Sequence, residues 1–184
     1  TIEIQEGNLV NYILKPFSHL VDHFIGELGW RMIQGAMGFV VLLFFLFALH
    51  VPISITTSPP ILILLIFSMV FAYIVSFLCK MILGISAFWF TDFRGMQEIV
   101  EVLILLFGGF LMPLEFYPQI LQTITHFLPF AYFAYYPVIL AEGKLDIMQG
   151  IMVLGVQVMW IAVLAVIYDF LWKRGLYNFT GVGR

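Results

Sequence analysis

Two long stretches of the sequence carry no charged side chain. No Lys, Arg, Asp or Glu occurs between Met32 and Cys79, or between Ile147 and Tyr168. About 20 apolar residues let one helix cross the hydrocarbon core of a bilayer, so the first stretch is long enough for two crossings and the second for one. Only 10% of the residues are charged, whereas a soluble domain carries about 25%. The chain is therefore expected to be an all-α, polytopic membrane protein.

The apolar segments and the turn signals between them predict four transmembrane spans. They are expected at about residues 30–49, 61–90, 97–112 and 147–171. The pair Pro59-Pro60 separates the first two spans, because proline stops a preceding helix and is well placed to open the next one. Together with a tail at 172–184, these spans form a predicted transmembrane domain over residues 30–184.

Residues 1–29 have the polar character of an ordinary soluble segment. Pro16 is well placed to begin a helix, since its missing N–H would be unpaired there in any case. After Pro16, apolar residues recur at the spacing of one helical face. This pattern predicts an amphipathic helix that lies at the membrane surface and leads into the first span. His19 and His23 are four residues apart, but they have no third ligand nearby, so no metal site is predicted.

Residues 113–142 are too apolar for a solvated loop, and three prolines, Pro118, Pro129 and Pro137, interrupt them too often for a membrane crossing. Several tyrosines follow Pro129, and tyrosine favours the headgroup level of a membrane. Non-helical backbone at membrane depth must be buried in protein or line a cavity. We therefore predict a re-entrant helical hairpin. A pair of helices lying on the membrane surface is the alternative.

The positive charges predict the orientation of the chain, because Lys and Arg are enriched in cytoplasmic loops. With four spans and a cytoplasmic N-terminal segment, only Lys144 lies outside. The remaining cations lie on the inner side: Lys15, Arg31, Lys80, Arg94, Lys173, Arg174 and Arg184. Both terminal segments are thus expected in the cytoplasm and the hairpin on the outer face of the membrane.

The sequence lacks the common signatures of soluble chemistry. It has no GxxxxGK[ST] loop for nucleotide phosphates and no GxSxG nucleophile elbow. No His, Cys and Asp cluster has zinc-ligand spacing, and the net charge of −3 gives no footprint for nucleic acid. No catalytic residue, metal ligand or cofactor is therefore predicted in this chain.

Two carboxylates lie at the start of the third predicted span. Glu98 and Glu101 are three residues apart, so they share a helix face. The same face is expected to hold Leu105, Gly108 and Met112, and the Gly108-Gly109 pair allows another helix to approach closely. Charges near a membrane are costly and usually functional, which predicts a transport pathway or a dimer interface. The alternative is that both carboxylates only lie in the headgroup layer.

Several short motifs, in their order along the chain, resemble the ABC-2-type exporter permeases. They are Ile4…Glu6-Gly7-Asn8-Leu9…Leu14-Lys15-Pro16, then Phe88-Trp89, then Gly108-Gly109-Phe110-Leu111-Met112-Pro113-Leu114…Phe116-Tyr117-Pro118, then Pro129-Phe130, Pro137 and Gly143, and finally Trp172-Lys173-Arg174-Gly175-Leu176…Gly181. The chain is most similar to bacterial six-span permeases of the daunorubicin- or viologen-exporter type. Because that family has six spans, the four predicted here correspond to its C-terminal portion.

The resemblance implies a mechanism. Two permeases, identical or different, would pair in the plasma membrane, and each would dock on a separate ABC ATPase that binds ATP and Mg²⁺. The third span would line the pathway. The implied coupling residues are Glu6, Gly7, Asn8, Leu9, Tyr12, Lys15 and Pro16. The implied outer gate consists of Pro113, Phe116, Pro118, Pro129, Phe130 and Pro137.

Two other function classes remain open at this stage. A secondary transporter or channel would be expected to show an inverted repeat or a row of midplane charges, and a membrane-embedded enzyme would need convergent catalytic side chains. None of these features is evident in the sequence. The substrate is not defined by the residues, since an aromatic, weakly charged pathway suits drug-like molecules, lipids and glycolipids equally.

Overall fold

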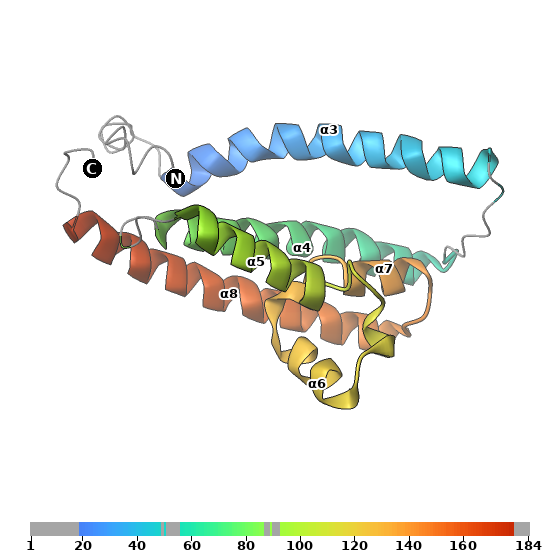
Figure 1. Cartoon of the computed structure of the whole chain (residues 1–184). Coiled ribbons are helices and arrows are strands. Elements are labelled where there is room, and N and C mark those ends of the chain that lie inside the picture. Colours follow the sequence, from blue (N-terminus) through green and yellow to red (C-terminus); the bar gives the residue numbers. More distant parts are fainter. Residues whose placement is uncertain (1–18, 49, 51–55, 87–88, 90–92, 179–184) are drawn as a thin grey trace.

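The computed structural model describes the whole chain except residues 1–18, 49, 51–55, 87–88, 90–92 and 179–184 (Figure 1). The described residues are helical and include no strand. The elements are α3 (His19–Phe47), α4 (Pro59–Ile85), α5 (Phe93–Phe107), η2 (Leu114–Phe116), α6 (Gln119–Phe127), η3 (Pro129–Tyr132), α7 (Tyr135–Ala141) and α8 (Ile147–Asn178). The predicted all-α class is confirmed.

Three of these helices, α3, α4 and α8, are long and apolar enough to cross a membrane. The chain is therefore a multi-pass membrane protein. In α3 the predicted surface helix and the first predicted span form one continuous helix, with no break near residue 29. The physical reason is that no proline lies between Pro16 and Pro52, so nothing in this segment forces the helix to end.

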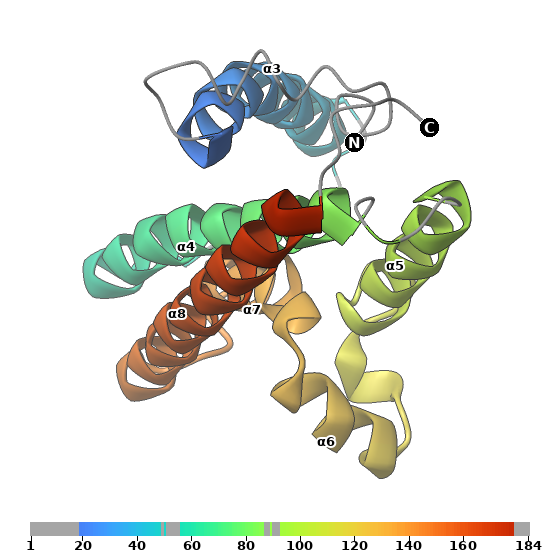
Figure 2. The same cartoon turned by 90° about the vertical axis from the view of Figure 1, so that its left-hand side faces the viewer.

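Helices α4 and α8 pack side by side and run in the same direction (Figures 1 and 2). Leu64 lies beside Gly150, Ser68 is hydrogen-bonded to Gln157 and Val75 packs in one cluster with Leu164, so the residue numbers rise together along both helices. We call the end of the bundle where α4 and α8 begin the hairpin end. The end where they finish is the opposite end.

Helix α5 is shorter than the span predicted at residues 97–112, and that prediction is wrong at both ends. The helix covers Phe93–Phe107, 15 residues, which at 1.5 Å per residue is about 22 Å and less than the ~30 Å hydrocarbon core. It ends there because Gly108 and Gly109 follow, and Gly109 has φ of +78°, a conformation that leaves the right-handed helix. Residues 108–112 form turns instead.

The segment predicted as a hairpin forms α6, η3 and α7. Its two parts, Gln119–Phe127 and Pro129–Ala141, are bent by 72°. Because α4 and α8 are parallel, the chain between them must run back from the opposite end of the bundle to the hairpin end. Figure 1 shows α5 running from the opposite end toward the hairpin end, followed by α6, η3 and α7, which lead to the start of α8. By length and composition, the bent pair fits either a broken span or a re-entrant loop.

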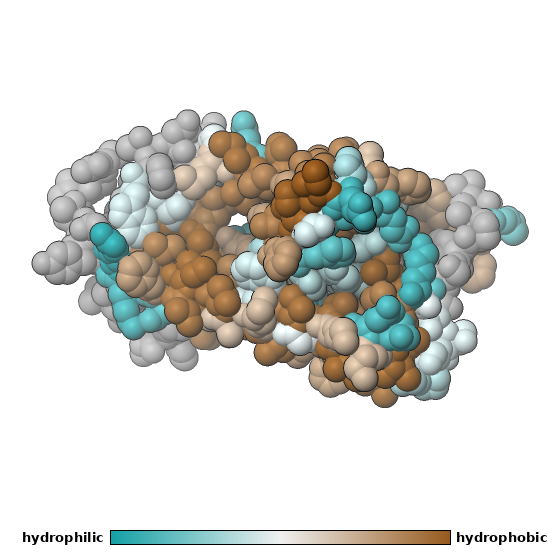
Figure 3. All heavy atoms as spheres, turned by 90° about the horizontal axis from the view of Figure 1, so that it is seen from below, coloured by the Kyte–Doolittle hydropathy of each residue, from teal (hydrophilic) through white to brown (hydrophobic). Residues whose placement is uncertain are grey.

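The hairpin docks on α4 and α8 through a buried apolar cluster. Its members are Leu114, Tyr117, Ala131, Tyr132, Leu140 and Val153. Helix α3 lies apart from this core (Figure 2) and contacts α4 near its start, where Phe24 packs edge-on against Phe77 and Glu27 pairs with Lys80. Figure 3 shows that apolar residues cover broad areas of the face viewed, as expected for a surface in contact with lipid.

Candidate functional site

The first part of the hairpin is fixed to the end of α5 by side-chain hydrogen bonds. The Tyr117 hydroxyl donates to the Leu106 carbonyl at 2.7 Å. The Gln122 amide donates to the carbonyls of Glu115 and Tyr117 at 3.1 Å and 2.9 Å. These bonds satisfy carbonyls in a segment that is too irregular to pair its own backbone, and they hold η2 and α6 in one position relative to α5.

The second part of the hairpin is an aromatic cluster. The rings of Tyr132 and Tyr136 stack with their centroids 4.5 Å apart, and Tyr135 meets Tyr136 edge-on at 5.4 Å. The Tyr136 hydroxyl is hydrogen-bonded to His126 Nδ1, and the Tyr132 hydroxyl donates to the His126 carbonyl at 3.2 Å. This cluster joins the end of α6 to the start of α7, so the two arms of the hairpin are cross-linked.

The residues predicted as an outer gate all lie along this hairpin. Pro113 precedes η2, Pro118 precedes α6, and Pro129 begins η3. Pro129 and Pro137 are buried, whereas the Phe116 side chain is 74% exposed. The ring of Phe130 packs edge-on against Phe133. Pro113, Pro118 and Pro129 thus mark where η2, α6 and η3 begin, whereas Pro137 lies in the first turn of α7.

The predicted face of the third span is divided by the structure. Glu98, Glu101 and Leu105 are exposed on α5, and the Gln97 amide donates to Glu101 at 2.8 Å. Gly108, Gly109 and Met112 lie beyond the end of the helix and therefore do not continue this face. The close approach predicted at the glycines is made by the hairpin, because a Cβ on Gly109 would lie 3.2 Å from the Tyr135 Cβ.

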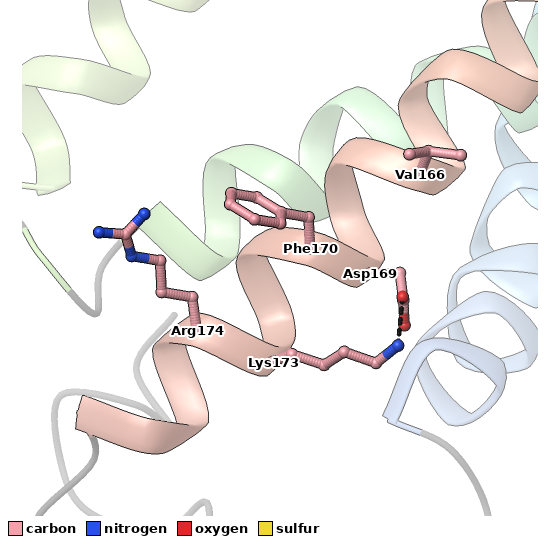
Figure 4. Close-up of a pocket in the computed structure, with 5 residues that line it drawn as sticks. All are labelled: Val166, Asp169, Phe170, Lys173 and Arg174. Carbon is pink, nitrogen blue, oxygen red and sulfur yellow. Dashed lines mark hydrogen bonds and ion pairs between the residues drawn. The ribbon is translucent and has the colours of Figure 1, made fainter.

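Charged groups gather at the opposite end of the bundle. Glu27 pairs with both Arg31 and Lys80 at 2.9 Å, and Lys173 pairs with Asp169 at 2.6 Å. Figure 4 shows Lys173 and Arg174 pointing to different sides of α8, beside the apolar residues Val166 and Phe170 that line a shallow groove. At the hairpin end Lys144 pairs with Glu142 at 2.8 Å, a bond that raises the pKa of Lys144 and keeps it protonated.

Two further predictions concern the coupling residues and the absence of a metal site. The coupling residues Glu6, Gly7, Asn8, Leu9, Tyr12, Lys15 and Pro16 lie outside the described residues. Within the described part, no group of three or more His, Cys, Asp or Glu residues is placed to hold a metal ion.

One polar contact of the hairpin was missed in the sequence. The fully buried Gln157 of α8 donates to the Tyr132 carbonyl in the hairpin and to Ser68 of α4. The available signal was that Gln157 interrupts an otherwise apolar span, since polar residues inside a membrane are costly and tend to face protein. The pattern alone does not indicate which residues meet it.

Comparison with known families supports the resemblance that the motifs indicated. A family model described as "ABC-2 family transporter protein" matches residues 1–183. No curated protein and no solved structure matches the chain. The family match covers nearly every residue, including the N-terminal segment, α5, the hairpin and α8. The chain therefore belongs to the ABC-2 family of transporter proteins and is a membrane component of an ABC transporter.

Proposed function

We propose that this chain is the permease subunit of an ATP-driven exporter, which moves a drug-like molecule, lipid or glycolipid out of the cell. The observation that carries the proposal, beside the family, is the hairpin, bent by 72°, between two parallel spanning helices, and we propose that it is re-entrant. Such a hairpin closes one end of a bundle without crossing it, so it suits a gate at the exit of a pathway. The hairpin end then faces outward.

The charge distribution supports this orientation. Among the described residues, Arg31, Lys80, Lys173 and Arg174 lie toward the opposite end of the bundle and Lys144 lies at the hairpin end. Since Lys and Arg are enriched on the cytoplasmic side, the opposite end and both terminal segments are placed in the cytoplasm of a cell whose plasma membrane holds the protein. The N-terminal segment is then on the side where an ATPase is found.

Energy would come from a partner, since the sequence has no nucleotide-binding motif. Two permeases would associate, as a homodimer or heterodimer, and each would bind one ABC ATPase that holds ATP and Mg²⁺. ATP binding would favour closure of the ATPases, and the coupling residues at 6–16 would pass this movement to α3. The permease would shift from an inward-open to an outward-open population, because the two states bind the closed ATPases with different affinity.

Glu98 and Glu101 would act by charge near the cytoplasmic mouth of the pathway. Both side chains are exposed on the second and third turns of α5, which begins toward the opposite end of the bundle. In this position they would attract a substrate with positive charge or contact the second permease. Their role is electrostatic, and neither residue is proposed as a catalyst.

The orientation is tested with single cysteines in a Cys79→Ala background. In intact cells, a membrane-impermeant maleimide is expected to label Lys144→Cys, because Lys144 is exposed at the hairpin end. The same reagent is expected to label Arg174→Cys only after the cells are permeabilised, because Arg174 lies at the cytoplasmic end of α8. Labelling of Arg174→Cys in intact cells would reverse the proposed orientation and remove the hairpin from the exit.

A further inference from the structure

The hairpin reaches a buried polar contact about a third of the way along α4 and α8. Gln157 is ten residues beyond Ile147, the first residue of α8 (157 − 147 = 10), and Ser68 is nine residues beyond Pro59, the first residue of α4 (68 − 59 = 9). At 1.5 Å per residue both lie about 14–15 Å from the hairpin end. Helices α4 and α8, with 27 and 32 residues, are about 40 Å and 48 Å long, so the contact lies inside the bundle and not at its end.

The Gln157 amide joins three separate elements at this depth. Its Nε2 lies 3.1 Å from the Ser68 carbonyl, 3.1 Å from the Ser68 hydroxyl and 3.1 Å from the Tyr132 carbonyl. Gln157 and Ser68 are both fully buried. Tyr132 is the last residue of the 3-10 helix η3, so its carbonyl has no partner within that helix, and it must find its partner elsewhere in the protein. Gln157 therefore holds the tip of the hairpin against α4 and α8.

The same contact leaves two polar atoms unpaired. The Gln157 Oε1 and the Trp160 Nε1 are buried and have no hydrogen-bond partner. The two residues are three apart on α8, so they share one face of the helix. Unpaired buried groups destabilise the conformation that holds them. A displaced hairpin would open this face to water or to another hydrogen-bonding group, and both atoms would then be satisfied.

We infer that Gln157 is a positioning residue that latches the hairpin in its docked conformation and releases it when the exit opens. The bonds to Tyr132 and Ser68 favour the docked conformation, and the unpaired Oε1 and Trp160 Nε1 limit how strongly it is favoured. Two opposing contributions of this kind keep two positions of the hairpin close in free energy, as a gate requires. The role of the latch in transport rests on the proposed role of the hairpin as the gate. The latch itself does not depend on that role.

The latch is tested by the accessibility of the hairpin tip in proteoliposomes, without ATPase or substrate. Ala131, beside Tyr132, is fully buried, so Ala131→Cys in a Cys79→Ala background reports on undocking. Gln157→Met keeps an unbranched side chain of similar length and removes both the donor and the unpaired Oε1. We expect it to raise the labelling rate of Ala131→Cys by a small, impermeant thiosulfonate reagent at least tenfold, with little change in thermal stability.

Two variants serve as comparisons. Gln149→Met changes the exposed glutamine at the start of α8, where its amide oxygen accepts from the Asp146 N–H, and is expected to leave the labelling rate unchanged. Ser68→Ala removes one acceptor but keeps the Ser68 carbonyl, so a smaller increase is expected. A residue that only stabilised the bundle would instead lower its melting temperature without selective exposure of the tip.

A labelling rate within twofold of the parent in Gln157→Met would overturn the latch. If Gln157→Met is not monodisperse in detergent, Gln157→Asn tests the same point, because its amide is one carbon too short to reach Tyr132, and unchanged labelling there would also overturn it. Unchanged labelling together with normal ATP-driven export refutes the latch and leaves the proposed exporter standing. Raised labelling in a protein that shows no ATP-driven export supports the latch and refutes the proposed function.

Discussion

Replacing Leu9 and Tyr12 together by Asp is expected to reduce ATP-driven export at least tenfold. These residues are the apolar side chains of the proposed coupling segment, and docking in an apolar groove of the ATPase would bury them. A carboxylate without a partner is very costly to bury, so the variant should lose its contact with the ATPase. The measurement is export and ATP hydrolysis in vesicles that hold both proteins.

The matched control is Thr1→Asp with Gln5→Asp. It adds the same two charges to the same segment without replacing an apolar residue, and near-normal export is expected. Both double variants should insert normally, because the spanning helices are unchanged. If the Leu9 and Tyr12 variant bound the ATPase and exported at the normal rate, the segment would not be the coupling element.

Gly150→Leu is expected to destabilise the bundle strongly. Even a Cβ at this position would lie 2.8 Å from Leu64 Cδ1 in α4 and 3.2 Å from Leu140 Cδ2 in α7. The small residue therefore lets three helices approach closely, as is common in membrane bundles. A leucine side chain would separate α8 from both neighbours, at a cost of about 1–3 kcal/mol or more. In detergent, this should lower the apparent melting temperature by roughly 5 °C or more.

Gly155 provides the comparison on the same helix. A Cβ at Gly155 would meet no atom within 4 Å, so Gly155→Leu should face open space or lipid and leave the melting temperature nearly unchanged. Equal stability of the two variants would contradict the packing of α8 between α4 and α7 described above.

Much of the fold follows directly from the sequence, because its physical causes are local. The spans in α4 and α8 can be predicted from their charge-free stretches without tertiary information, since length and apolarity alone determine whether a helix spans a membrane. The hairpin can be predicted for a similar reason. Pro118 immediately precedes α6 and Pro129 begins η3, because proline constrains its own φ in any context.

The remaining features depend on contacts between distant residues. The end of α5 at Phe107 was missed because Gly108 and Gly109 suit either a helix contact or a helix end, and the approach of Tyr135 decides between them. Gln157 and Ser68 are 89 residues apart in sequence, and only the parallel packing of α4 and α8 brings them together. Likewise, local periodicity does not show whether the residues before the first predicted span form a separate amphipathic helix or the start of a spanning helix. In the structure they are part of the continuous helix α3.

The most direct test of the central claim is the energy source of transport. Inside-out vesicles holding the permease and its ATPase are incubated with a panel of fluorescent drugs and labelled lipids in the medium. We predict that accumulation of at least one probe requires ATP, stops when the P-loop lysine of the ATPase is replaced by alanine, and persists when ion gradients are collapsed. Accumulation that continues with the inactive ATPase and follows an ion gradient would contradict the proposal and identify a secondary transporter.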